Sequence, residues 1–392
     1  MKIPTFPKLT VWRVLVALIF AAGLYATVVR FAQGFQASTN LSDAYPWGLW
    51  VGLNTLCGVG LSAGGFAIAA AVYILGLERY RPVVRTAIVI AFLWYLTVVA
   101  GMLFELGLPW RIWHPIVLWN RSSVLFEVAW CVMLYTTVVA LEFCPTLFER
   151  LGWPRLQAWH PRILIGLVVV GVLLSSLHQS FLGGLYLITK GKLYPLWYSP
   201  QLPALFFLSA IPAGLAVVIM ALYLSARSLR AHFDLTIQRE LSFVIGLLLA
   251  LYALFRGIDL ISRGGWEYLW MMRAETGWFW LEVGLFVFLP LILLTYPQVR
   301  GSPLGLYWTS VIIVMGFMAN RLNVAINALQ ASAGVTYVPK WTEFAISLAV
   351  ITAAVVAFRL AAIHLRIFPV EEEPAAPLYG AVPSARAFTP AR

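Results

Sequence analysis

Two carboxylates on one apolar segment, Glu127 and Glu142, are the clearest candidates for proton chemistry in this sequence. Their separation of fifteen residues gives about 22 Å of rise and about 60° of rotation in an α-helix. Cys131 and Tyr135 fall on the same side of that helix, between the two carboxylates. This stripe predicts either a proton path along the helix or two separate carboxylates, each held by a neighbouring arginine.

A single histidine, His178, lies in another apolar segment with the sequence LSSLHQSFLGG. Gln179 and the small residues around it leave room for a ligand beside the imidazole. An imidazole in such a place is either a satisfied hydrogen-bonding group of the core or a ligand-binding group. The residues alone leave both interpretations open.

Further polar residues interrupt the later apolar segments. Arg256 and Asp259 are three residues apart, so we expect them to pair on one helix, with a structural role for Arg256. Three asparagines share a predicted helix face and serve either interhelical hydrogen bonding or the lining of a cavity: Asn320, Asn323 and Asn327. Tyr95, Glu105 and Glu282 are additional candidates for buried polar groups.

The segments that position these residues are membrane helices. The chain has 392 residues, of which 61% are hydrophobic and 11% are charged, whereas soluble domains contain about 45–50% apolar and about 25% charged residues. This composition excludes an ordinary cytosolic enzyme, a disordered protein and a secreted disulfide scaffold. The net charge of +11 is attributed to loop residues that fix membrane topology rather than to nucleic-acid binding.

The fold class predicted is an all-α polytopic membrane protein. A bilayer-spanning helix needs about 20 apolar residues, and ten segments qualify: 11–33, 48–77, 84–106, 122–147, 162–188, 203–226, 241–262, 277–297, 304–328 and 342–365. The first is longer than the apolar region of a signal peptide, so we interpret it as an uncleaved helix. Residues 1–368 form one transmembrane domain in this prediction, and residues 369–392 form a disordered cytoplasmic tail.

Most of the 27 Lys and Arg residues fall on the side that holds both termini, which predicts that both termini are cytoplasmic. The outer loops are instead rich in Trp and Pro. Two of them, PWRIWHP (Pro109–Pro115) and KLYPLW (Lys192–Trp197), are interpreted as a docking surface for another protein. The alternative is that their Trp residues are interfacial anchors.

Two other motifs do not indicate cofactor sites. The sequence GVGLSA at 58–63 matches a dinucleotide-binding pattern but lies inside an apolar helix, so Gly60 and Gly64 are assigned to close helix packing. The three cysteines form no C-x-x-C pair, which makes disulfides, zinc and iron–sulfur ligation improbable. Only His178 is well inside a span, so no histidine pair at matching depth is predicted for a haem.

The sequence resembles the NrfD/polysulfide-reductase family of membrane subunits, and in particular its ten-helix branch, the HybB-type subunits associated with nickel–iron hydrogenases. The segments that carry the resemblance span residues 45–345. They are YPWGLWVGLNTLCGVGLSAGGFA, PWRIWHPIVLWNRSSVLFEVAWCVMLYTTVVALEFCPTLFERLGW, LHQSFLGGLYLI with KLYPLWYSPQLP, and NRLNVA. The resemblance implies a haem-free anchor in the cytoplasmic membrane of a bacterium or archaeon that reacts with menaquinone.

The resemblance also implies partners and residue roles. The partners are an outer-face, ferredoxin-like iron–sulfur subunit and a catalytic subunit, either a hydrogenase, a molybdoenzyme or a multihaem cytochrome. The implied quinone and proton-path positions are Glu127, His178, Tyr95, Arg85 and Glu142, with Asn54 and Trp50 as further quinone-binding residues and Asp259 as an acidic site residue. One departure is Ala221, where some relatives carry an acidic residue, which weakens an unbroken proton route.

The function predicted is electron exchange between an iron–sulfur partner and menaquinone, with possible proton translocation. His178 would bind a quinone oxygen, and Glu127 would move the accompanying proton. One alternative is a proton-coupled secondary transporter that uses Glu127, His178 and Asp259. Another is a passive membrane anchor whose polar groups only hold helices together.

Overall fold

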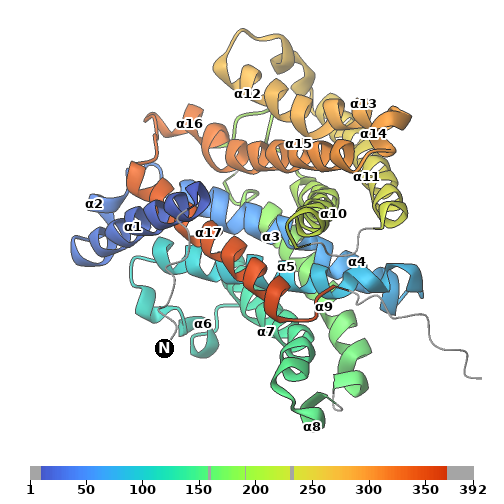
Figure 1. The fold of residues 1–392 in the computed structure, drawn as a ribbon. Coiled ribbons are helices and arrows are strands. Elements are labelled where there is room, and N and C mark those ends of the chain that lie inside the picture. Colours follow the sequence, from blue (N-terminus) through green and yellow to red (C-terminus); the bar gives the residue numbers. More distant parts are fainter. Residues whose placement is uncertain (1–9, 158–159, 190, 230–233, 369–392) are drawn as a thin grey trace, which may run out of the picture.

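The structure, a computed structural model, describes residues 10–157, 160–189, 191–229 and 234–368, and the elements within them are helices (Figure 1). Ten spans are long and apolar enough to cross a membrane, which confirms the predicted number for the described residues. The predicted tail, residues 369–392, lies outside them.

Six of the spans are single helices: α1 (Val11–Ala32), α7 (Val124–Leu151), α9 (His160–Leu185), α10 (Leu202–Leu229), α11 (Leu235–Ser262) and α17 (Trp341–His364). The others are composite. The second contains η1 (Trp50–Cys57), α3 (Gly58–Leu61) and α4 (Ala63–Tyr73), and the third contains η2 (Glu78–Tyr80) and α5 (Arg81–Glu105). The eighth contains α12 (Ala274–Val283), η5 (Gly284–Phe288) and α13 (Leu289–Thr295), and the ninth contains α15 (Pro303–Leu322), η6 (Asn323–Asn327) and α16 (Ala328–Ala333).

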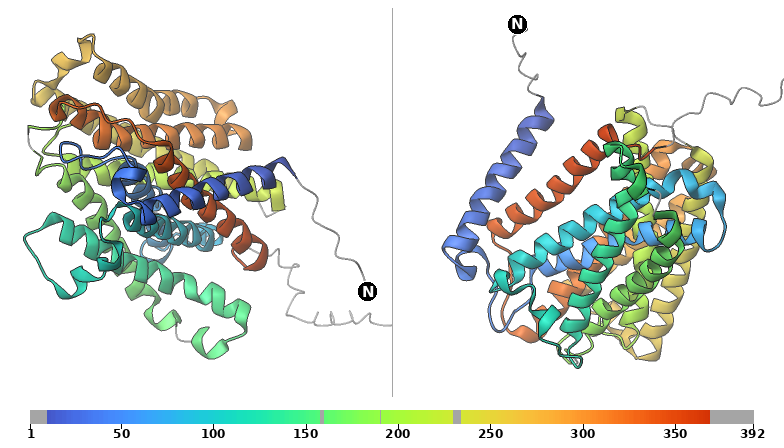
Figure 2. Two further views of the ribbon diagram at one scale, coloured as in Figure 1. Left: turned by 90° about the vertical axis from the view of Figure 1, so that its left-hand side faces the viewer. Right: turned by 90° about the horizontal axis from the view of Figure 1, so that it is seen from below.

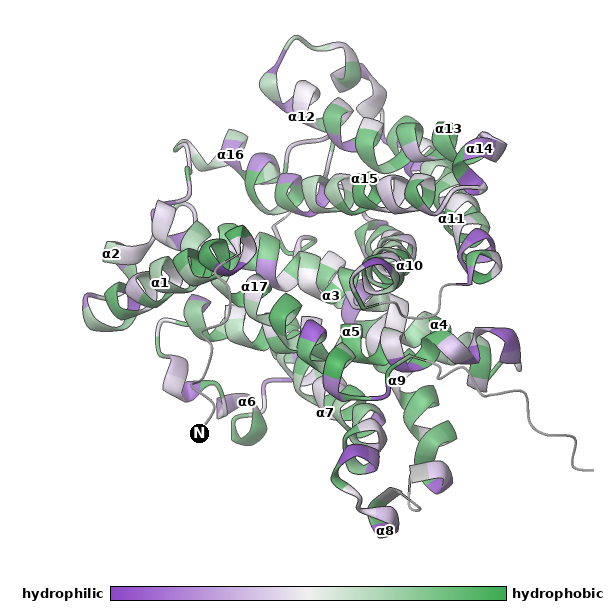
Figure 3. Cartoon of the chain, viewed as in Figure 1, coloured by the Kyte–Doolittle hydropathy of each residue, from purple (hydrophilic) through white to green (hydrophobic). Residues whose placement is uncertain are grey.

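Short helices connect the spans. They are α2 (Phe35–Ser38), η3 (Pro109–Arg111), α6 (His114–Val117), α8 (Pro154–Gln157), η4 (Gly265–Trp270) and α14 (Pro297–Arg300). Hydrophilic residues gather mainly at helix ends and in these connections, while the long helices are hydrophobic along most of their length (Figure 3). This distribution is the one expected of helices that face lipid.

Local sequence signals set several helix ends. The Ser123 side chain caps α7 by accepting a hydrogen bond from the Phe126 backbone N–H, and Gly152 ends that helix in the left-handed conformation at φ 68°. The Asp234 side chain accepts from the N–H groups of Thr236 and Ile237, so α11 begins six residues before the predicted apolar segment at 241. An apolar criterion omits such polar first turns.

α10 lies at the centre of the bundle and packs against α4, α9, α11 and α15 (Figures 1 and 2). Its contact with α4 is a direct approach of two backbones. A Cβ added to Gly214 would lie 2.2 Å from the Gly64 nitrogen, and one added to Gly60 would lie 2.2 Å from the ring of Phe317. Gly60 and Gly64 therefore serve close helix packing, as predicted.

Three stretches, η1, η5 and η6, are π-helical and not α-helical. Such turns bond residue i to residue i+5, are rare, and occur frequently at functional sites. They contain or adjoin the buried polar residues Asn54, Glu282 and Asn323. The three stretches were not predicted, because hydrophobic spacing does not distinguish one wide turn from an α-turn.

Candidate functional site

The candidate site begins at η1, which carries Trp50 and Asn54. Asn54 is completely buried, and neither its Oδ1 nor its Nδ2 atom has a hydrogen-bond partner. Gly101 of α5 makes room for it, because a Cβ at that position would lie 2.5 Å from the Asn54 Cβ. Trp50 is also buried, and its Nε1 donates to the Glu343 carbonyl oxygen at 3.2 Å.

Two further buried polar atoms without partners belong to α5 and to the end of α9. Glu105 is one helical turn beyond Gly101 on α5, and its Oε2 is unpaired. The Tyr186 hydroxyl, just after α9, is unpaired as well, and Tyr186 is close enough to Glu105 for electrostatic interaction. More than about 90% of buried polar groups in proteins have a partner, so this group of unpaired atoms indicates a place for water or a ligand.

The segment before η1 is fixed by Tyr337. The backbone N–H of Leu49, the residue before η1, donates to the Tyr337 hydroxyl at 2.9 Å. That hydroxyl in turn donates to the carboxylate of Glu343. The Tyr45 ring stacks on Tyr337 at 4.9 Å between centroids. Burial, and after it the bond to Glu343, raise the pKa of Tyr337, which keeps the hydroxyl protonated as a donor. The start of α17 thus sets the position of η1.

Tyr95 and His178 form a hydrogen-bonded pair deeper in the bundle. The Tyr95 hydroxyl lies 2.8 Å from Nδ1 of His178, both residues are completely buried, and Nε2 of His178 has no partner. The ring of Tyr135 lies 4.5 Å from that of Tyr95. His178 is eight residues before Tyr186, which places it about 12 Å below the level of Tyr186. The predicted site residues therefore divide into an outer group with Asn54 and a deeper pair.

The two carboxylates of α7 differ in their surroundings. Glu127 is half-buried in the first turn of the helix. Glu142 is buried beside Gly171 of α9, and a Cβ added to Gly171 would lie 3.6 Å from the Glu142 Oε1. Tyr135 lies between them in sequence and is close enough to Glu142 for electrostatic interaction.

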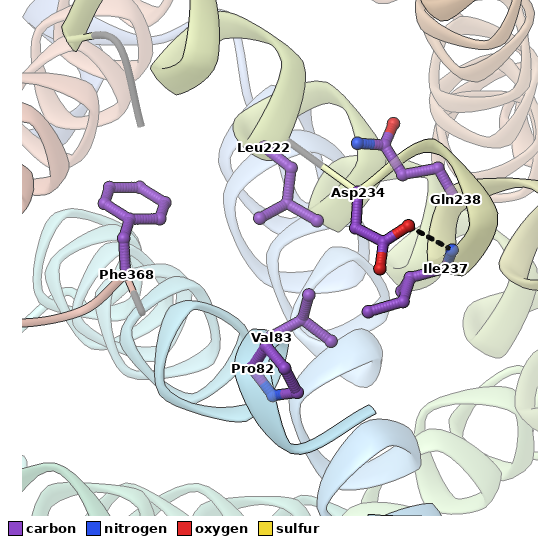
Figure 4. A pocket seen from close by; sticks show the side chains of 7 residues that line it. All are labelled: Pro82, Val83, Leu222, Asp234, Ile237, Gln238 and Phe368. Carbon is purple, nitrogen blue, oxygen red and sulfur yellow. Dashed lines mark hydrogen bonds between the residues drawn. The ribbon is translucent and has the colours of Figure 1, made fainter. Parts of the chain in front are cut away.

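Arg85 lies at the other end of the bundle, half-exposed, in an ion-pair cluster. Its guanidinium is 2.9 Å from Glu149, which Arg366 also approaches at 3.3 Å. A cavity of about 20 Å³ lies at the same end, lined in part by Asp234, Gln238 and Phe368 (Figure 4). That volume suits a single water molecule, and the unpaired Oε1 of Gln238 offers it a hydrogen bond.

The predicted pairing of Arg256 with Asp259 is wrong. Asp259 forms its ion pair with Arg263, at 2.8 Å, and accepts a hydrogen bond from Ser199 at 2.7 Å. Arg256 donates to the Leu196 carbonyl oxygen at 2.7 Å. Arg256 and Asp259 therefore both bind the segment that follows α9, through the Leu196 carbonyl oxygen and the Ser199 hydroxyl.

That segment includes Lys192–Trp197, and its burial contradicts its predicted role as a docking surface. Leu196 and Trp197 are 0% exposed. The other predicted docking loop, Pro109–Pro115, is exposed: Trp110 has 67% and Trp113 has 52% of its surface accessible. Of the two predicted docking loops, Pro109–Pro115 remains a candidate interface.

Two asparagines of the ninth span, Asn320 and Asn323, form interhelical hydrogen bonds, and Asn327 donates to Asn323 in the same span at 2.7 Å. The Glu282 carboxylate accepts from Asn320 at 2.5 Å, from Asn323 at 2.7 Å and from Trp197 at 2.8 Å. Arg321 donates to the Asn320 Oδ1 at 2.6 Å and is completely buried. This network joins α12, α15 and η6 to the segment before α10.

Residues that could ligate a metal are dispersed. No group of three His, Cys, Asp or Glu side chains occurs among the described residues. Cys57, Cys131 and Cys144 are free thiols. Tyr186 is the main site residue that the sequence did not reveal, because a tyrosine just beyond a helix end resembles an ordinary interfacial anchor.

Known proteins similar to this chain match it over most of its length. The chain is 37% identical to a protein of Nitratidesulfovibrio vulgaris over 92% of this chain and 95% of that one. It is 30% identical to the probable Ni/Fe-hydrogenase 2 b-type cytochrome subunit of Escherichia coli, over 88% of both chains. It is 26% identical to the menaquinone reductase integral membrane subunit of N. vulgaris, over 93% of both chains.

Residues 37–333 match the family described as polysulphide reductase, NrfD. The matched region begins before η1 and ends with α16, so it contains Asn54, Tyr95, His178 and Glu142. The chain belongs to the polysulphide reductase NrfD family of integral membrane proteins.

Proposed function

We propose that this chain is the membrane subunit of an oxidoreductase complex and exchanges electrons with menaquinone. The observation that carries the proposal is the group of unpaired, buried polar atoms on Asn54, Glu105 and Tyr186 near one end of the bundle. Two similar proteins support it by name, a menaquinone reductase subunit and an Hdr-like menaquinol oxidoreductase subunit.

The chemistry of these groups suits both forms of a quinone. Carbonyl oxygens of a quinone accept hydrogen bonds, and hydroxyls of a quinol also donate them. The Asn54 amide and the Tyr186 hydroxyl each offer a donor and an acceptor. In this proposal they bind one carbonyl of the ring, and Trp50 closes one side. The deeper His178, whose Nε2 is unpaired, binds the opposite carbonyl.

Interconversion of quinone and quinol takes up or releases two electrons and two protons. We assign the electrons to an iron–sulfur subunit docked on the outer face, at the exposed loop Pro109–Pro115. Trp and Arg dominate binding hot spots, and Trp110, Arg111 and Trp113 fit that role. A hydrogenase, a molybdoenzyme or a multihaem cytochrome would complete the complex.

We assign the protons to Glu127 and to a route along α7. Tyr95 and Tyr135 are in ring contact, and Glu142 follows toward the end where Arg85 and Glu149 pair. This route would place proton exchange on the side of both termini, in the cytoplasm of a bacterial or archaeal cell.

A b-type haem does not suit the histidines of the described bundle. Bis-histidine ligation requires two imidazoles at matching depth. Among the described residues, His178 is buried inside α9, whereas His114, His160 and His364 stand at helix ends. We therefore expect no stoichiometric Soret band from the purified chain, although a relative carries the name of a b-type cytochrome subunit. Bands that disappear in His178→Ala would contradict this expectation.

The deciding experiment is purification of the chain with its neighbours from native membranes. We expect co-purified menaquinone and an iron–sulfur subunit, with bound quinone lost in Asn54→Leu and retained in Asn40→Leu, a change outside the candidate site. Uptake of a substrate driven by a proton gradient, without bound quinone, would instead support a transporter. An intact complex whose quinone reaction is unaffected by Asn54→Leu would support a passive anchor.

A further inference from the structure

A groove of about 300 Å³ opens between α1 and α17 on the side of the bundle that faces lipid. Leu18 and Ala22 of α1 line it together with Phe344, Ala345 and Leu348 of α17. We infer that the isoprenoid tail of menaquinone lies in this groove. The inference rests on the function proposed above and adds the place where the substrate's tail binds.

The groove adjoins the candidate site. Ala22 and Ala345 belong both to the groove and to a small hydrophobic cluster around Trp50 and Phe104. Trp50 and Asn54 are one turn apart on η1, and the Trp50 and Phe104 rings are 6.0 Å apart. A single layer of aromatic side chains therefore separates the groove from the unpaired atoms.

The groove and the site also lie at the same depth. The Trp50 indole donates to the backbone of Glu343, so η1 and α17 begin at the same level. Leu348 is seven residues into α17, about 10 Å below that level, and Asn54 is one turn into η1. A ring bound at Asn54 would thus place its tail in the same leaflet as the groove.

The chemistry of the lining favours a hydrocarbon chain. Its side chains are aliphatic or aromatic, and Leu18 remains 62% exposed. The isoprenoid tail is attached to the quinone ring beside a carbonyl group, so it must leave a polar ring site sideways into an apolar space. Because lipid is as apolar as the groove, the tail gains packing and a fixed direction there and little transfer energy.

The test compares two quinones with the same ring, menaquinone-4 with its tail and menadione without one. The full complex is placed in phosphatidylcholine nanodiscs, and bound quinone is extracted and quantified. Leu18→Trp and Leu348→Trp fill the groove from its exposed side. Leu24→Trp and Leu360→Trp are matched controls, because Leu24 lies about 200° around α1 from Ala22 and both residues are exposed.

We expect the groove-filling variants to raise the Kd for menaquinone-4 by about fivefold to tenfold and to leave that for menadione within about twofold. The control variants should match the original chain for both compounds. Equal binding of menaquinone-4 in all variants would overturn the groove assignment alone, and so would a loss of bound phospholipid without a change in that Kd. Failure of the original chain to bind either quinone would overturn the proposed function itself.

Discussion

The hydroxyl of Tyr95 on α5 and Nδ1 of His178 on α9 lie 2.8 Å apart, at the centre of a completely buried pair. The direction of this bond decides the state of the other imidazole nitrogen. If the hydroxyl donates to Nδ1, Nε2 carries a proton and suits a quinone carbonyl. If Nδ1 donates, Nε2 is an acceptor and suits a quinol hydroxyl.

Tyr95→Phe removes this control over the imidazole. We expect quinone-linked turnover to fall at least about tenfold and the free energy of unfolding to fall by about 1–3 kcal/mol, because a buried nitrogen loses its partner. Turnover with menaquinol and thermal unfolding measure the two effects. Tyr252→Phe on α11 is the control, since Tyr252 is also buried but lies outside the proposed proton route and the bond to His178. Equal losses in both variants would show that only packing matters.

Glu127→Gln and Glu142→Gln separate two roles of the α7 carboxylates. We expect the first to lower quinone-linked turnover strongly, because it removes the proton carrier nearest the outer face. The second should impair proton movement across the membrane more than electron transfer. Turnover and pH changes in sealed vesicles measure these effects. Loss of complex assembly in both variants would indicate purely structural carboxylates.

Asp259→Asn tests whether Asp259 has a structural role, namely holding the segment after α9 against α11. Its carboxylate pairs with Arg263 and accepts from Ser199, so its neutralisation should lower the free energy of unfolding by about 1.5–3 kcal/mol. Thermal unfolding is the measurement, and residual turnover per folded complex should stay near that of the original chain. A selective loss of turnover at unchanged stability would instead support the role of Asp259 as an acidic site residue.

Gly214→Val should prevent stable assembly of the bundle. A Cβ at Gly214 would lie 2.2 Å from the backbone nitrogen of Gly64, and backbone atoms cannot move aside as a flexible side chain can. The amount of folded protein in the membrane, measured by fluorescence-detected size exclusion, checks this. Gly184→Val on α9 is the control, because nothing lies within 4 Å of its added Cβ.

Apolar length and small-residue spacing were sufficient to predict the ten spans and the use of Gly60 and Gly64 for close helix packing, though not the helix that packs there. The stripe on α7 also followed from α-helical spacing, because α7 is continuous there: Cys131, Tyr135 and Glu142 are buried, and Glu127 at its start is half-buried. These features depend on residues close together in the sequence, where one helix geometry applies throughout.

Features that depend on competition between distant groups were not predictable. Asp259 pairs with Arg263 and not with Arg256. Ser199 donates to the Asp259 carboxylate, and the Leu196 carbonyl oxygen accepts from the Arg256 guanidinium, and both of these partners belong to a different segment. Lys192–Trp197 was predicted to be an outer loop. In the structure Trp197 donates to Glu282 and the Leu196 carbonyl oxygen accepts from Arg256, so these residues are buried in the bundle. The unpaired atoms of Asn54 depend on a π-helical turn whose stability comes from the packing of neighbouring helices.

The π-helical turn at η1 amounts to one residue inserted into a helix. Deleting one residue between Trp50 and Cys57 would restore regular α-helical hydrogen bonding. It would also rotate the chain before the deletion by about 100° relative to α3 and α4. Trp50 and the segment that leads to Tyr45 would then turn away from α17. In this part of the chain a deletion is therefore more damaging than most substitutions, and the number of residues between Tyr45 and Gly64 is itself part of the design of the site.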